Sequence, residues 1–130
     1  MKYLTEFLGT FFLVFIIGLS SNPLVIGLGL SILIYLGAKF SGAHYNPAVS
    51  ISFYLKKTIS ISVCFLYILC QIFGAICAAL LISILTERLV LEPNLNEPYF
   101  LIILSELFFT FLMILVIFLV AIYPKTKGNK

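Results

Sequence analysis

The chain has 130 residues, of which 62% are hydrophobic and only 10% are charged. A soluble domain cannot hide that much apolar surface, so the composition excludes a soluble globular protein and is typical of an integral membrane protein. The formal net charge of +3 is small, and we expect a lipid bilayer, not nucleic acid, as the partner of the chain's surface.

Four apolar segments are predicted to be membrane-spanning helices, at residues 3–20, 24–38, 59–85 and 99–123. A helix needs about 20 residues to cross a bilayer, so the second segment is short, and it ends at Lys39, whose long stem can reach the headgroups. The first segment lacks a clear cleavage site, which favours a retained span over a signal peptide. The pair Asn22-Pro23 predicts the turn between the first two spans.

A polar interruption, SGAHYNPAVS at residues 41–50, follows the second span. Asn46 before Pro47 predicts a helix start, because an Asn side-chain oxygen caps free backbone N–H groups and Pro at the first helical position loses no hydrogen bond. The helix is expected to run from Pro47 to about Lys56, which is too short to cross the membrane. Irregular backbone at membrane depth must line a cavity or be buried in protein, so we predict a re-entrant segment at 41–56.

The predicted cap would leave the NH₂ group of Asn46 available as a hydrogen-bond donor. With its carbonyl oxygen on the backbone, its amide group keeps two hydrogens to donate toward whatever lies in front of the helix. The helix dipole adds about half a positive charge at the same point, which favours lone pairs and disfavours cations. The alternative is that Asn46 is only a helix cap. His44, two residues earlier, is expected to brace the loop.

The basic residues predict the orientation of the chain. If the N-terminus is cytoplasmic, seven lysines lie inside and only Arg88 lies outside, as the positive-inside rule requires. We therefore expect a multi-pass protein of the plasma membrane with both termini in the cytoplasm. The seven lysines are Lys2, Lys39, Lys56, Lys57, Lys125, Lys127 and Lys130.

A short motif occurs twice: a glutamate followed four residues later by Thr-Phe, at Glu6 and again at Glu106. With four spans the two copies run in opposite directions, as in an inverted-topology repeat. A glutamate within an apolar span is expected to face the bundle and to have a partner, because exposure to lipid is costly. The alternative use, as a proton relay, would make the protein an ion-coupled transporter.

Together these features resemble the major intrinsic protein family, the aquaporins and aquaglyceroporins. The resemblance rests on SGAHYNPAVS as the first signature loop and on YILCQIFGAI as part of the third helix. It implies an all-α membrane protein, an aquaporin-like helical bundle with one re-entrant half-helix and about four transmembrane helices. The implied domains are a first repeat at 1–98 with its outer loop at 86–98, a fourth span at 99–123 that opens an incomplete second repeat, and a basic cytoplasmic tail at 124–130.

The resemblance also implies two sets of site residues. The first set, for the pore and its selectivity, comprises Asn46, Pro47, Ala48, His44 and Ile26. Ile26 stands where the family's filter takes a residue that is often aromatic, so an aliphatic residue there is less typical of a strict water channel. The second set is a structural buried network of Glu6, Glu106 and Gln71, in which the glutamates hold backbone groups of the loops.

Three cysteines, Cys64, Cys70 and Cys77, lie inside one apolar span and are expected to pack as small apolar residues. Their spacing does not bring three thiolates to one helix face, and His44 is the single histidine of the chain. We therefore expect no metal and no other cofactor.

These predictions favour a channel, not an enzyme, through which water or a small neutral solute such as glycerol diffuses down its gradient. A second polypeptide that supplies the other half, or a homo-oligomer (a tetramer by analogy with the family), is the expected partner. One alternative is a truncated, non-conducting membrane fragment that acts at most as a structural partner. Another is an ion-coupled transporter or membrane enzyme that uses Glu6, Glu106 or His44.

Overall fold

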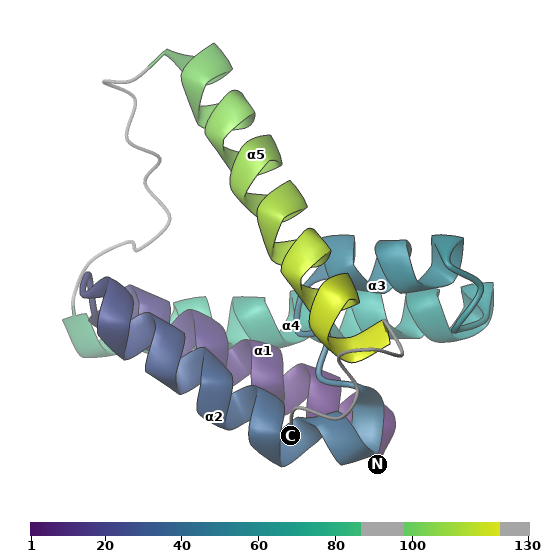
Figure 1. Ribbon diagram of the computed structural model, residues 1–130. Helices are drawn as coiled ribbons and strands as arrows, with labels where there is room; N and C mark the ends of the chain where they lie inside the picture. Colours follow the sequence, from purple (N-terminus) through teal and green to yellow (C-terminus); the bar gives the residue numbers. More distant parts are fainter. Residues whose placement is uncertain (87–97, 123–130) are drawn as a thin grey trace. The chain divides into compact units, whose positions relative to one another are not determined.

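The structure, a computed structural model, describes residues 1–86 and 98–122, and all regular structure in these ranges is helical. The helices are α1 (Lys2–Leu19), α2 (Pro23–Ser41), α3 (Pro47–Leu55), α4 (Ile61–Thr86) and α5 (Tyr99–Ile117), which continues into a short π-helical segment, η1 (Phe118–Ile122) (Figure 1). The predicted all-α fold class is confirmed.

Four helical segments are long and apolar enough to cross a membrane: α1, α2, α4 and the run Tyr99–Val120 that contains α5. The number of predicted spans is thus confirmed as four candidates, although α4 begins at Ile61 and not at 59, and residue 123 of the fourth predicted span lies outside the described residues. Helix α2 is longer than predicted, because it begins at Pro23 and continues past Lys39 to Ser41. It ends at Gly42, whose φ of 89° lies in the left-handed region that glycine adopts at little cost.

The chain divides into two units, Met1–Glu92 and Pro93–Lys130. In the first unit α1 lies between α2 and α4 and packs against both, while the short α3 packs against α4 (Figure 1). The described part of the second unit consists of α5 and η1. Residues 87–97 of the predicted outer loop and the predicted tail at 124–130 lie outside the described residues.

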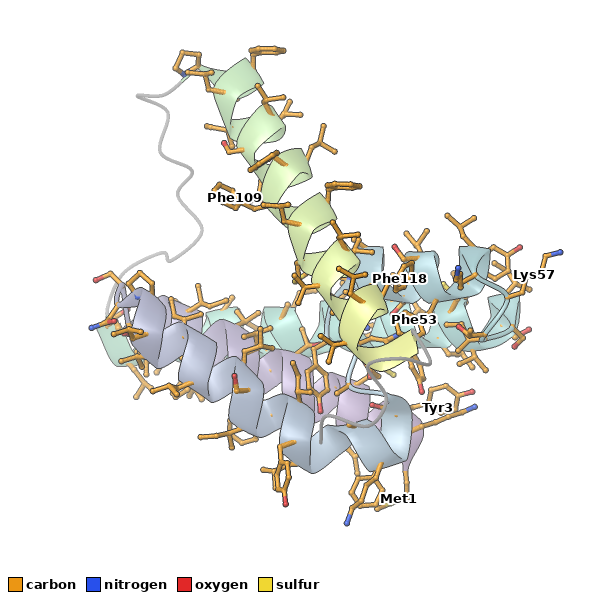
Figure 2. All side chains as sticks on the ribbon, in the orientation of Figure 1. Met1, Tyr3, Phe53, Lys57, Phe109 and Phe118 are labelled. Carbon is orange, nitrogen blue, oxygen red and sulfur yellow. The ribbon has the colours of Figure 1, made fainter. Side chains whose placement is uncertain are left out.

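Large apolar side chains cover the outward faces of the first unit. On α2, for example, Leu24, Leu28 and Tyr35 are all exposed. Figure 2 shows this predominantly carbon surface, together with Lys57, whose charged end lies at the turn beyond α3. A surface of this kind is stable when lipid, not water, surrounds it.

Close packing of α1 and α4 depends on a glycine. A Cβ atom on Gly74 of α4 would overlap the carbonyl oxygen of Phe7 and would lie 3.2 Å from the backbone nitrogen of Phe11. Both atoms belong to the main chain of α1, which cannot rotate aside as a side chain can. The missing side chain at Gly74 therefore lets the two backbones touch, as small residues do where membrane helices pack.

This contact predicts different effects for two glycine substitutions. Gly74→Ala should lower the free energy of unfolding in detergent or bilayers by about 1–3 kcal/mol, because α1 must move away. Gly27→Ala is the matched control, since nothing lies within 4 Å of a Cβ added at Gly27 on α2. Equal unfolding free energies for the two variants would contradict the packing argument.

Candidate functional site

The loop that joins α2 to α3 has an unusual backbone. Besides Gly42, both Ala43 and Tyr45 have positive φ angles, 52° and 50°. Residues with a side chain adopt this left-handed region at a cost of about 1–2 kcal/mol each. Ala43, His44 and Tyr45 are nonetheless all buried, so surrounding groups must hold the loop in this conformation.

The loop ends at Asn46, which caps α3. Its Oδ1 atom accepts a hydrogen bond of 2.8 Å from the backbone N–H of Ala48, and Pro47 occupies the first helical position. Among the described residues, the Nδ2 atom of Asn46 donates to none. The half-buried amide therefore keeps both hydrogens at the positive end of the α3 dipole.

The carboxylate of Glu6, on α1, holds the loop. Its Oε1 atom accepts hydrogen bonds from the hydroxyl of Ser41 at 2.6 Å and from the backbone N–H of His44 at 3.0 Å. Its Oε2 atom accepts from the backbone N–H of Tyr45 at 2.7 Å and from Nε2 of Gln71 at 2.8 Å. Glu6 is fully buried, and these four donors fill the acceptor positions of its two oxygens.

Gln71 and Ser50 extend this network to α3 and the loop. Nε2 of Gln71 also donates to the hydroxyl of Ser50 at 3.0 Å, and that hydroxyl lies 3.1 Å from Nδ1 of His44. Among the described residues, Nδ1 of His44 is the acceptor left for the Ser50 hydroxyl hydrogen. This hydrogen-bond assignment gives His44 the neutral form with its proton on Nε2.

His44 is enclosed by rings and lies outside the four spans. Its ring centroid lies 4.4 Å from that of Phe53 and 5.2 Å from that of Tyr67, and the Tyr67 hydroxyl donates to the carbonyl of Ser41. Burial lowers the pKa of His44, and the nearby charge of Glu6 opposes this shift. The lowered pKa agrees with a neutral imidazole that braces the loop.

The structure brings some of the predicted site residues together. Glu6, Gln71 and His44 belong to one network, and Asn46, with Pro47 and Ala48, follows directly at the start of α3. Ser50 and Tyr45 join this network and were not singled out from the sequence. The signal at Ser50 was its hydroxyl within a short apolar helix, since such a group needs a partner when it is buried.

Two predicted residues lie elsewhere. Ile26 lies near the start of α2, about 22 Å along the helix axis from Ser41 at the opposite end. Glu106 lies on an exposed face of α5, in the second unit. Their roles in selectivity and in a buried network stay predictions.

The described residues contain no group of three or more His, Cys, Asp or Glu side chains that could hold a metal ion. The three cysteines of α4 are free thiols, of which Cys64 is buried and Cys77 is exposed.

Comparison with known proteins gives one match to a family model over the whole chain and matches to individual proteins over parts of it. The family model described as "Major intrinsic protein" matches residues 1–130. The "Glycerol uptake facilitator protein" of Pseudomonas aeruginosa is 39% identical over 103 residues, which cover 68% of this chain and 37% of that protein. The "Probable aquaporin TIP-type" of Medicago truncatula is 30% identical over 114 residues, which cover 86% of this chain and 45% of that protein. The chain thus spans less than half the length of these curated relatives.

The role of Glu6 can be tested by Glu6→Gln, which replaces one acceptor oxygen with an NH₂ group that faces other donors. The amides of His44 and Tyr45 bond to different oxygens of Glu6, so one of them should lose its acceptor. Hydrogen exchange at that amide should become about 100-fold faster, because a buried donor that loses a charged acceptor costs up to about 3 kcal/mol. The control is Ser31→Ala, which removes an exposed hydroxyl bonded to the carbonyl of Gly27. Unchanged exchange at both amides in Glu6→Gln would show that the carboxylate does not hold the loop.

Proposed function

Because the chain belongs to the major intrinsic protein family, we propose that it acts as a channel, or as one half of a channel, for the passive transport of water or small neutral solutes such as glycerol. It is a multi-pass membrane protein of a family of channels, not of enzymes. The chain covers only part of each relative. We therefore propose conduction for this chain and do not infer it from the names of the relatives.

The amide of Asn46 is the observation that carries the proposal. Its oxygen is used by the α3 cap, whereas its NH₂ group has no acceptor among the residues that the structure describes. An unpaired donor in a protein surrounded by lipid needs an acceptor, and the oxygen of a passing water or alcohol supplies one. We expect the amide to orient such molecules one after another.

The charge distribution favours neutral permeants over ions. The positive end of the α3 dipole lies beside Asn46 and repels cations. The carboxylate of Glu6 could attract them, but its oxygens already accept four hydrogen bonds within the protein. The same four bonds argue against the proton relay considered from the sequence, because a relay needs an exposed and exchangeable site.

The choice of permeant stays between water and glycerol. Relatives named as glycerol uptake facilitators are 39% and 37% identical to the matched part of the chain, and a relative named as a probable aquaporin is 30% identical. The aliphatic Ile26 favours a solute larger than water, since the family's filter often has an aromatic residue at this place. We further propose that both termini are cytoplasmic, that 1–98 forms a first repeat, and that another polypeptide or another copy completes the pore.

Conduction is tested in proteoliposomes by stopped-flow light scattering under an osmotic gradient of sucrose or glycerol. Vesicles with the chain should shrink or re-swell faster than empty vesicles. If the chain is half of a channel, co-reconstitution with the part of the Pseudomonas relative that the chain does not match should raise the rate further. Rates equal to those of empty vesicles in both arms would contradict the proposal and favour a non-conducting fragment.

The role of Asn46 is tested with a matched pair of variants. Asn46→Asp keeps the cap, because Asp caps helices as well as Asn, but removes both donors and adds a negative charge. Permeability should fall roughly tenfold, which corresponds to the loss of about one hydrogen bond between the permeant and the protein.

The control for this variant is Asn22→Asp. Asn22 also precedes a proline, and its Oδ1 atom accepts from the backbone N–H of Leu24 at 2.9 Å, but it lies in an exposed turn. The two asparagines therefore share their cap chemistry and differ in location. Equal permeability losses in the two variants would assign Asn46 a capping role alone.

A further inference from the structure

Tyr45 fills a notch between two helices. The residue is only 4% exposed although it belongs to a loop. A Cβ atom on Gly9 of α1 would overlap the Tyr45 ring, and a Cβ atom on Gly37 of α2 would overlap its hydroxyl oxygen and lie 2.9 Å from Cζ. Both helices therefore lack a side chain where this ring passes between them. We call this the glycine notch, defined by Gly9 and Gly37.

Both ends of Tyr45 are fixed by hydrogen bonds. Its backbone N–H donates to Oε2 of Glu6 on α1 at 2.7 Å, and its hydroxyl donates to the carbonyl of Leu33 on α2 at 3.0 Å. One residue thus connects the loop to two membrane-spanning helices. None of these contacts involves the next residue, Asn46, directly.

The backbone of Tyr45 is held in a costly conformation. Its φ of 50° belongs to the left-handed region, which a residue with a large side chain leaves unless its surroundings compensate. The buried ring and the two hydrogen bonds supply that compensation. If they were weakened, Tyr45 would relax toward negative φ, and this rotation would turn the following peptide and the side chain of Asn46.

We infer that Tyr45 is the positioning residue for the Asn46 amide, because the glycine notch and the Leu33 carbonyl fix the backbone angle from which Asn46 projects. This inference rests on the proposed function, since the direction of the amide matters only if it meets a permeant. The alternative is that Tyr45 only fills the protein interior. A positioning role predicts that a substitution at Tyr45 affects mainly the start of α3, whereas a filling role predicts an effect on all the helices.

The first test removes one atom. Tyr45→Phe keeps the ring in the notch and deletes the bond to Leu33, so amide exchange at Ala48, whose N–H donates to Asn46, should become about fivefold faster. Exchange in the middle of α1 and α4 should stay unchanged. The control is Tyr35→Phe, which removes the same hydroxyl group from a tyrosine of α2 that is 85% exposed. A uniform increase across all helices, or no difference from the control, would overturn the inference.

The second test uses the notch itself. Gly37→Ala in the wild-type background should make amide hydrogen exchange at Ala48 more than tenfold faster. The new methyl group would overlap the Tyr45 hydroxyl and displace it. In the Tyr45→Phe background the same substitution should add less than half of that effect. Gly27→Ala, which meets open space, controls for glycine replacement on α2. Purely additive effects of Gly37→Ala and Tyr45→Phe would contradict the notch.

Permeability, measured on the same variants, separates this inference from the proposed function. A selective change at Ala48 with a parallel fall in permeability supports both. If the change at Ala48 occurs but vesicles with the chain conduct no faster than empty vesicles, the proposed function and the role of Tyr45 in transport are refuted. The conclusion that Tyr45 fixes the loop at Asn46 would still hold. Unchanged exchange at Ala48 with normal conduction would refute the inference alone.

Discussion

The structure depends on one buried carboxylate. A charged group inside an apolar helix is costly, and so is a backbone that leaves the helical conformation within a membrane. In this chain the two costs offset each other, because Glu6 of α1 accepts hydrogen bonds from the consecutive backbone N–H groups of His44 and Tyr45. The carboxylate of Glu6 thus obtains the hydrogen-bond donors that it needs, and the N–H groups of the loop obtain their acceptors. The position of Asn46 follows from this pairing.

Most polar side-chain groups around the loop are hydrogen-bonded, but the NH₂ group of Asn46 and the buried Oε1 atom of Gln71 have no partner among the described residues. Gln71, Ser50 and the ring of His44 bond to one another or to Glu6. Within the described part of the chain, the amide hydrogens of Asn46 have no such partner. The glycines of the helices make the arrangement compact, since the notch admits Tyr45 and the contact at Gly74 brings α4, with Gln71, up to α1.

The sequence predicted the parts that depend on local signals. Asn46 before Pro47 marks a helix start wherever it occurs, and the four apolar runs are long enough to identify as spans. The partners of Glu6 could not be predicted from spacing, because they lie 35 residues or more along the chain. The glycine notch was missed for the same reason: it forms only when α1 and α2 pack around Tyr45. Ile26 and Glu106 were assigned to the site by resemblance alone, and their roles stay predictions.

The bond between Glu6 and the loop can be measured directly in lipid bilayers. His44 is the only histidine of the chain, so ¹⁵N-histidine labels a single backbone amide, and ¹³Cδ-glutamate labels the carboxylates. Rotational-echo double-resonance NMR should detect a carboxyl carbon within about 4 Å of this amide nitrogen, as a hydrogen bond between the two groups requires, and the signal should disappear in Glu6→Gln. Absence of dipolar coupling in the wild-type chain, or its persistence in Glu6→Gln, would contradict the account.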